Sequence, residues 1–343
     1  YQLGAAGGDS IQLQTQIERG DAKHAPFYYP LILGESTLHW LDTSILSGQI
    51  RRGEVIIKGR MKDFPFVNAA HQPDPALGIF KVTAQVDHAS LEYGTGWPLI
   101  QGIDGFLKFE GKRMDIAVKN GTTVGQRITQ AHVEIPQLDA DWPMLNVKAT
   151  VVGSVEPGIK FVNTSPVHEV TMGFTDYLKA NGDAELKLAL QIPLNDVDAS
   201  KFQGDYAIKN GRIAANAEIA LPAMNNINGH LKLTEKGLQA QGIQLSMFDN
   251  PATVSLTTQS DKSVIIQGSG RITDVALKKM DNNLLTKALH GTTDWKSNIM
   301  SQPTNNVRLD MRSQLIGMAI DLPEPMKKSV EPQATLTIRL RQE

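Results

Sequence analysis

The sequence predicts a mainly β protein with a few short α-helices, and three observations support this class. Apolar residues recur at every second position over most of the 343 residues. Glycine-containing turn sequences separate many of these alternating segments, as they do in β-hairpins. An order of helix, glycine and strand occurs three times along the chain. Together these features predict a long antiparallel β-meander that helices interrupt at intervals.

The alternating segments place apolar side chains on one face of each predicted strand. The intervening positions hold mostly Lys, Gln, Thr, Glu, Asp and Asn, which is the pattern of an antiparallel sheet covered on one side only. Hairpin turns are expected at 110–112, 120–121, 210–211 and 235–237, and one alternating strand is expected to run from Ile213 to Leu221.

Three short helices are predicted near 37–46, 167–179 and 282–289, each with an apolar stripe. Each is followed by a glycine (Gly53, Gly182 and Gly291, respectively) and then by a strand. This order predicts a repeating unit in which a helix precedes several strands.

A second internal match supports a repeat. Residues 103–109 (IDGFLKF) resemble residues 227–233 (INGHLKL), at an offset of 227 − 103 = 124. We therefore expect an N-terminal strand segment over 1–35, repeats over 36–165 and 166–280, and a partial repeat over 281–343. Stacked repeats form one continuous elongated body. A closed sandwich, a barrel and an open groove would each cover the apolar face, and the repeat with its helices favours an elongated, curved open sheet.

The composition excludes several classes of protein. The chain has no cysteine, which removes disulfides, thiol nucleophiles and cysteine-ligated zinc. A net charge of -2 and a pI near 6.5 argue against nucleic-acid binding. No apolar run approaches the ~20 residues of a membrane-spanning helix. Because the sequence begins at Tyr1, we expect a processed chain or part of a longer protein.

Residues that could carry catalysis are better explained as structural. The eight histidines lack metal-ligand spacing, so no metal site or cofactor is predicted. The pairs Asp139/Asp141 and Asp196/Asp198 read as turn residues rather than as catalytic carboxylates or calcium ligands. Gly268-Ser269-Gly270 lacks a strand-turn-helix context and predicts a β-bulge or kink. The sequence therefore predicts no enzyme activity.

Several longer segments resemble one protein family. Residues 38–66 (LHWLDTSILSGQIRRGEVIIKGRMKDFPF) are similar to a "WLD…G.V..GE…KG…DFPF" element of the AsmA-like YhdP family of Gram-negative envelope proteins. Residues 78–116, 200–245 and 313–328 resemble further stretches of that family in the same order. The resemblance is weakest over about the first 25 residues. It also departs at Glu324 and Met326, where alanine and a larger apolar residue are expected.

The resemblance implies a bridge-like lipid-transfer protein. Its β-sheet would curl into an open apolar groove, a repeating β-groove, that conducts phospholipid across the periplasm from the inner toward the outer membrane. The parent protein would hold the inner-membrane anchor outside this chain, which would itself be periplasmic and monomeric. No nucleic acid and no cofactor are expected as partners.

The groove-lining residues expected from the alternation are Val55, Ile57, Val82, Ala84, Val86, Leu107, Phe109, Ile116, Val118, Leu145, Val147, Leu186, Leu188, Leu190, Ile213, Ile219, Leu231, Leu233, Leu245, Val254 and Leu256. The residues expected on covering helices are Leu38, Leu41, Ile45, Val170, Phe174, Leu178, Leu284 and Leu285. Two other functions stay open at this point: a structural or adhesive β-solenoid, and a glycan-active enzyme that uses an Asp pair.

Overall fold

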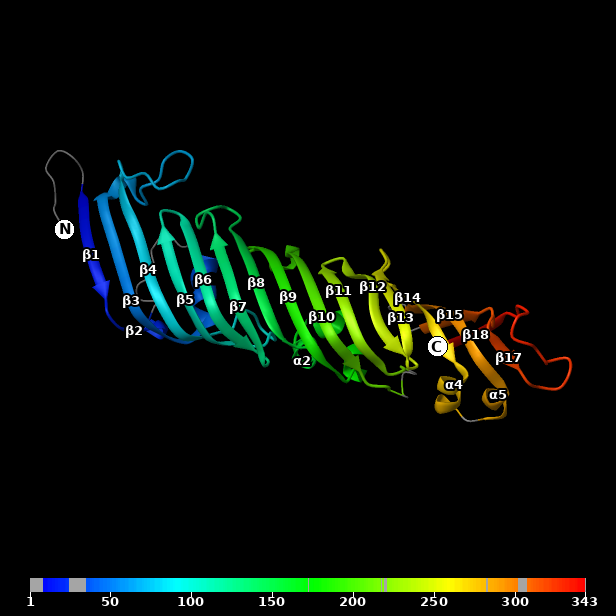
Figure 1. Ribbon diagram of the computed structural model, residues 1–343. Coiled ribbons are helices and arrows are strands. Elements are labelled where there is room, and N and C mark those ends of the chain that lie inside the picture. Colours follow the sequence, from blue (N-terminus) through cyan, green and yellow to red (C-terminus); the bar gives the residue numbers. More distant parts are fainter. Residues whose placement is uncertain are drawn as a thin grey trace. The chain divides into compact units, whose positions relative to one another are not determined.

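The computed structural model shows an antiparallel β protein with a few short helices, which confirms the predicted fold class (Figure 1). It describes residues 9–24, 35–171, 173–216, 218, 221–281, 283–301 and 307–342. The chain folds into two compact units: unit 1 comprises 1–153, 164–166 and 186–203, and unit 2 comprises 154–163, 167–185 and 204–343. The repeat boundaries expected from the sequence stay a prediction.

Unit 1 is an open antiparallel sheet whose neighbouring strands follow one another along the chain. Its first described edge is formed by β1 and β2, which both pair with β3. From there β3 to β8 pair successively. The elements are β1 (Ser10–Ile17), β2 (Gly20–Asp21), α1 (Glu35–Ser44), β3 (Ile45–Arg60), η2 (Met61–Asp63), β4 (Gly78–Leu91), β5 (Ile100–Glu110), β6 (Arg113–Thr123), β7 (Gln126–Ile135), β8 (Met144–Ser154) and η4 (Val197–Ala199).

Unit 2 repeats this arrangement, and β11 to β16 pair successively before β18 forms an edge on β16. Strands β9 (Ala180–Pro193) and β10 (Lys201–Ile213) have residues in both units. The remaining elements are α2 (Val155–Asn163), α3 (Val167–Val170), η3 (Phe174–Tyr177), β11 (Met224–Thr234), β12 (Gly237–Met247), β13 (Asn250–Thr258), β14 (Val264–Thr273), α4 (Asp274–Met280), α5 (Leu284–Lys287), β15 (Leu289–Ser301), β16 (Val307–Ser313), β17 (Met318–Ile320) and β18 (Leu336–Gln342).

The helices differ from the prediction in extent. The first begins and ends about two residues early, so Ile45 is the first residue of β3. The predicted helix over 167–179 is divided into α3 and η3, because Gly173 has a left-handed φ of 73° that an α-helix cannot accommodate. Helices α2 and α4 were not predicted. Each begins directly after a strand, with no intervening turn sequence to mark it.

Two of the four predicted turns are wrong. The turns after β5 and β11 lie where they were expected, but Asn120-Gly121 lies inside β6 and Asn210-Gly211 inside β10. Asn120 lies at an irregularity in the pairing of β5 with β6. Asn210 has a φ of 50° and donates its backbone N–H to the Asn228 side chain, at 3.0 Å. A left-handed asparagine suits a β-bulge as well as a hairpin turn, so the dipeptide does not distinguish them.

Two other local expectations are corrected. No strand runs over 213–221 as expected, because β10 ends at Ile213. Asn216 instead forms an isolated antiparallel bridge with Leu221. The segment Gly268-Ser269-Gly270 is neither bulged nor kinked, because its register is regular with β13 and with β15. These glycines instead lie beneath the ring of Trp295, as described below.

Four pairs of features recur at or near the offset of 124 that the sequence suggested. Strands β5 and β11 have bounds that differ by this offset at both ends, and so do β6 and β12. The turns after β6 and β12 hold left-handed residues at 124–125 and 248–249. At a left-handed residue within a strand of each unit, the N–H of His88 donates to the Asp104 side chain, and the N–H of Asn210 donates to the Asn228 side chain. The two units thus share a strand frame and left-handed residues within it.

Candidate functional site

The candidate site is the apolar face of the sheet, which each unit builds from alternate residues of neighbouring strands. In unit 1 the register aligns these residues into rows that cross the strands. One row consists of Val55, Val82, Phe109, Met114 and Ile135, the next of Gly53, Ala84, Leu107, Ile116, Val133 and Val147, and a third of Val86, Gly105, Val118, Ala131 and Ala149. We call this surface the unit 1 apolar face.

Part of the unit 1 apolar face is a packed core. Phe109, Met114, Ile135, Leu138 and Leu145 are buried together. Leu38 of α1 and Ile45 of β3 pack against this cluster, so α1 covers one end of the rows. The cluster is local, since most other row members, such as Val86 and Val118, are only partly buried.

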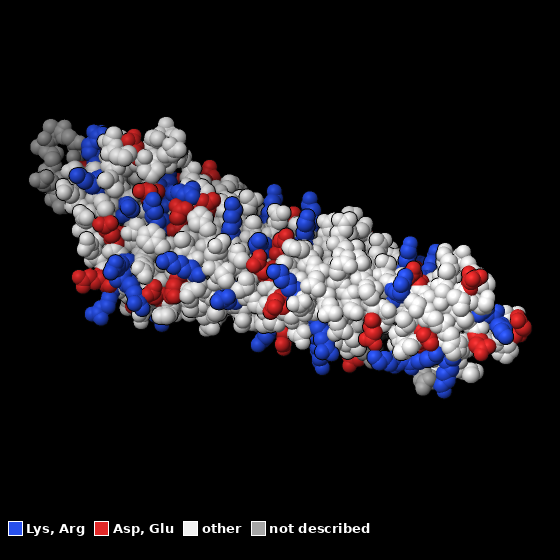
Figure 2. Space-filling view, viewed as in Figure 1, with Lys and Arg blue, Asp and Glu red and all other residues white. Residues whose placement is uncertain are grey.

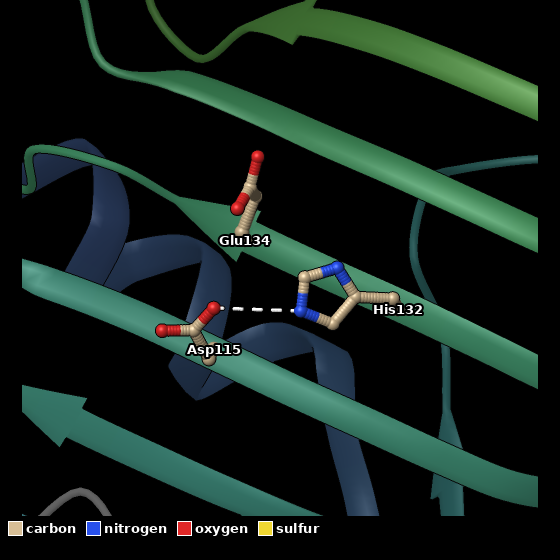
Figure 3. A group of neighbouring side chains, drawn as sticks. All are labelled: Asp115, His132 and Glu134. Carbon is tan, nitrogen blue, oxygen red and sulfur yellow. Dashed lines mark ion pairs between the residues drawn. The ribbon is translucent and has the colours of Figure 1, made fainter.

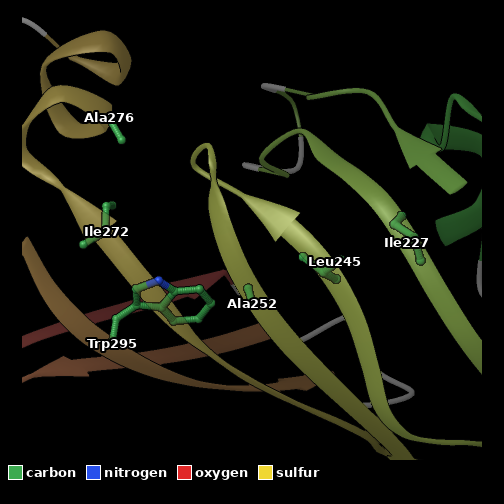
Figure 4. Packing of buried hydrophobic residues seen from close by; sticks show 6 residues of the cluster. All are labelled: Ile227, Leu245, Ala252, Ile272, Ala276 and Trp295. Atoms are coloured by element: carbon green, nitrogen blue, oxygen red, sulfur yellow. The ribbon is translucent and has the colours of Figure 1, made fainter. Parts of the chain in front are cut away.

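Unit 2 has a corresponding surface, which we call the unit 2 apolar face. One row consists of Leu231, Ala240, Leu256, Ile266, Ile299, Leu309 and Leu340, and another of Leu245, Ala252, Gly270, Trp295 and Ser313. Its buried cluster comprises Ile227, Leu245, Ala252, Ile272, Ala276 and Trp295 (Figure 4). Residues of β11, β12, β13, β14 and β15 therefore meet a helix residue, Ala276 of α4.

The cover of the unit 2 apolar face comes from a helix that the sequence did not predict. Ala276 and Leu277 of α4 belong to the cluster or pack against it. Leu284 and Leu285 of α5, which were expected to cover the groove, are instead 76% and 57% exposed. Two apolar residues of α4 are therefore packed in or against the cluster, whereas the two leucines of α5 are largely exposed.

Among the expected lining residues that the structure describes, none is classed as exposed. Ala84, Phe109, Leu145 and Leu245 are buried and the others are partly buried. Ile219 lies outside the described residues, as do the side chains of Leu41 and Val170. Of the other expected cover residues, Phe174 is 47% exposed and Leu178 is partly buried. Most of these residues are thus half-covered, with apolar atoms still accessible, and their role as a groove lining stays a prediction.

The opposite face of unit 1 is polar and carries charges of both signs. One row runs through Glu54, Thr83, Lys108, Asp115, Glu134 and Asn146. Acidic and basic side chains are intermixed over the unit 1 surface shown in Figure 2. The hydrogen bond from Arg113, at 2.8 Å from its Nε to Asp115, holds the pKa of the Asp115 carboxyl below its ordinary value. This face is therefore charged, and Asp115 and Glu134 are both paired with Arg113.

Asp115, His132 and Glu134 form the one group of potential metal ligands within the described part of the chain (Figure 3). His132 Nε2 lies 3.4 Å from Asp115 Oδ1. The guanidinium of Arg113 pairs with both carboxylates and so already supplies the positive charge that a cation would bring. The arrangement is explained as a cross-strand ion-pair network on the polar face.

Asp139, Asp141 and Asp196 lie in loops and Asp198 in the one-turn helix η4, and the structure brings these two segments together. Leu194 donates its N–H to Pro143 O at 2.9 Å, and the Asn195 side chain donates to Asp141 O at 2.6 Å. Asp139 is held by Lys112 at 2.6 Å, and this ion pair together with a hydrogen bond from Gln137 outweighs partial burial and lowers the pKa of its carboxyl. Asp139 is thus an ionised partner of a lysine, which does not suit a general acid.

Sequence reasoning missed two residues with marked environments. Trp295 is 3% exposed at the centre of the unit 2 cluster, although its segment carried no distinguishing pattern. Lys328 is 9% exposed, and its Nζ donates to Leu315 O and Met318 O at 2.8 Å each. Lys328 thus ties the end of the segment 313–328 to its beginning, and no pattern in the sequence distinguishes it from the exposed Lys327.

These features define a class of protein: open antiparallel sheets whose one face is apolar and partly accessible, and whose other face is polar. The chain belongs to the YhdP family, because the family model described as "YhdP protein" matches residues 1–343. Comparison with curated proteins and with solved structures gave no match. Among the described residues, no helix combines the length and apolarity needed to cross a bilayer.

Proposed function

We propose that this chain conducts phospholipid acyl chains along its apolar faces, as a non-enzymatic part of a lipid-transport protein in the periplasm between inner and outer membrane. The observation that carries the proposal is the series of cross-strand rows, whose aliphatic side chains are partly accessible in both units. Membership of the YhdP family supports it.

The energetics favour an acyl ligand. Exposing a tail of ~15 methylenes to water costs on the order of 12 kcal/mol, at about 0.8 kcal/mol per methylene. A continuous apolar surface removes much of this penalty at every step along the path. It needs smooth aliphatic side chains, and Val, Ile, Leu and Ala fill most positions of the rows.

The two rival functions have less support. A structural solenoid would use its apolar face as a closed core, whereas Val86, Val118 and Ile116 are only partly buried. A glycan-active enzyme would need a carboxyl able to hold a proton, whereas Asp139 is paired with Lys112. Asp139→Asn and Asp196→Asn are therefore expected to leave lipid transfer unchanged.

The test compares neighbouring residues that face opposite sides of β6. Val118 belongs to the unit 1 apolar face, and Ala117 lies exposed on the polar face. Val118→Asp should lower phospholipid transfer between vesicles about tenfold or more, because a carboxylate resists dehydration beside an acyl chain. Ala117→Asp should retain transfer.

Leu231→Asp, with its exposed neighbour Lys232→Asp as control, repeats this comparison in unit 2. Native mass spectrometry of the purified protein measures bound lipid directly. The proposal fails if no phospholipid is bound, or if Val118→Asp and Ala117→Asp transfer lipid equally well while both remain folded.

A further inference from the structure

Trp295 lies flat over two glycines of the neighbouring strand. A Cβ placed on Gly270 would approach its ring carbon Cζ2 to 3.0 Å, and one on Gly268 would approach Cζ3 to 3.1 Å. The register aligns Gly270 directly with Trp295, so the ring fills space that side chains on β14 would otherwise take. The indole therefore occupies the floor of the unit 2 apolar face.

Other apolar residues gather around the indole. Ile272 of β14 and Ala276 of α4 belong to the same cluster (Figure 4). Phe248 meets the ring edge-on, with centroids 6.2 Å apart. Apolar groups thus surround a side chain that carries a hydrogen-bond donor.

That donor has no acceptor. Trp295 Nε1 is buried and has no hydrogen-bond partner among the described residues, and Figure 4 shows this nitrogen on the ring edge nearest Ile272. A buried N–H that has lost water without gaining a partner is unfavourable, so buried donors are nearly always paired. The closed arrangement of Trp295 is therefore less stable than its packing alone would make it.

Helix α4, which contributes Ala276 to this cluster, is short. Its seven residues are capped by Thr273, and Lys278 pairs with Asp274 within the helix at 2.9 Å. An ion pair toward the sheet joins the exposed Lys279 to Asp249, in the turn between β12 and β13, at 2.8 Å. Its outer residues Val275 and Met280 are 67% and 59% exposed, so the helix carries apolar side chains on both faces. Because α4 already exposes apolar side chains to solvent, its movement away from the sheet would expose more surface of the same apolar kind.

We infer that Gly268 and Gly270 form the floor of an acyl-chain subsite that Trp295 and α4 close when no lipid is present. An entering acyl chain displaces the indole from the glycines, and the freed N–H then reaches water or an ester or carboxyl oxygen of the lipid. The inference rests on the proposed function and adds a specific position to it. The ligand class is a long-chain acyl lipid, either a phospholipid or a free fatty acid.

The test uses tryptophan emission with lipids brominated on the acyl chain, since bromine quenches only nearby indoles. A variant that retains Trp295 alone (W40F, W97F, W142F) is mixed with brominated phospholipid or, separately, brominated fatty acid. We expect about half or more of the Trp295 emission to be lost with the source that fits. A variant that retains only Trp142, which is 64% exposed and lies in unit 1, is the control and should be quenched little.

Bound lipid is counted on the same samples by native mass spectrometry, so that the two ideas can fail separately. If lipid is bound and Trp295 emission is unchanged, the subsite is wrong and the proposed function stands. If no lipid is bound at all, the proposed function fails and this inference with it. Quenching by fatty acid alone identifies the ligand source and supports the subsite.

Two substitutions at position 295 give a second readout. Trp295→Ala removes the ring that occupies the subsite in the absence of lipid. Acyl-lipid affinity should therefore rise about tenfold, because the lipid no longer has to displace an indole. Trp295→Phe retains an aromatic ring without the unpaired N–H and should leave affinity between those of the native protein and Trp295→Ala. Weaker lipid binding by a folded Trp295→Ala protein would overturn the inference; if that variant does not fold, the quenching result decides.

Discussion

The two units share a strand frame but fill it differently. In the central row of the unit 1 apolar face, Gly53 and Ala84 lie beside the aliphatic side chains of the next strands, and the surface stays partly accessible. At the centre of the unit 2 apolar face, Trp295 covers Gly268 and Gly270. Strand lengths and bulges therefore set the frame, while single side chains decide whether a stretch of the face is open or filled.

The left-handed residues within strands show a second, chemical difference within the same geometry. In unit 1 a carboxylate, Asp104, accepts the N–H of the left-handed residue His88, whereas in unit 2 the amide of Asn228 accepts that of Asn210. The shape is the same in both, but only the first is sensitive to protonation.

The largest effect is expected in the unit 1 cluster. Phe109→Ala should lower the free energy of unfolding by about 3–5 kcal/mol, because it leaves a cavity among Met114 and Ile135. Chemical denaturation measures the change. Phe106→Ala, on the opposite face of the same strand and 43% exposed, should lower it by less than about 1 kcal/mol. Equal effects would mean that the cluster is not a core.

Lys328 should matter next, because unit 2 has a loop that depends on one buried ammonium. Lys328→Met leaves the carbonyls of Leu315 and Met318 without their donor and should cost about 2–3 kcal/mol. Faster hydrogen exchange over 314–331 would report the loss. Lys327→Met, at an exposed neighbour, serves as the control and should change nothing measurable.

The same contrast between the units predicts that a methyl group added at Gly270, beneath the Trp295 ring, lowers stability more than one added at Gly53 in unit 1. Gly270→Ala would bring a Cβ to 2.9 Å from Ala252 Cβ and 3.0 Å from the Trp295 ring, and should lower stability by about 1–3 kcal/mol. At Gly53 the closest atom is Ile17 Cβ at 3.2 Å, so Gly53→Ala should cost less than about 1 kcal/mol. Thermal unfolding of both variants would show whether the order reverses.

The smallest expected effect is a loss of stability at low pH that depends on Asp104. Hydrogen bonds from the His88 N–H and then from Asn120 hold the pKa of Asp104 below its ordinary value of 3.8. Because the folded-state pKa is depressed, its contribution to stability is present above that ordinary value and is lost as pH falls through the lower folded value. The His88 amide resonance should move in this acid range while that of Asn210 stays. In Asp104→Asn the His88 amide should stay as well.

Local pattern determined the fold class and most of the apolar face. Alternation at every second residue assigns each side chain to one face of its strand, so the rows through Val82, Leu107 and Ile116 could be anticipated once strands were assumed to pair in sequence. The offset of 124 likewise predicted that β5 and β11 would correspond. Both features depend only on patterns of residues along the chain, so they can be read from the sequence without knowing any contact between distant segments.

Only the tertiary structure decided the features that depend on contacts between distant segments. Asn210-Gly211 reads as a turn, yet it lies inside β10, where the left-handed Asn210 donates its N–H to the Asn228 side chain on the next strand. Gly268 and Gly270 read as a kink, yet they lie in a regular strand because the Trp295 ring, on β15, takes the space of their missing side chains. Which helix covers the sheet was also undetermined, because the burial of Ala276 rather than Leu284 depends on how α4 meets the cluster. Sequence specifies which face a residue occupies, and packing between strands decides what fills it.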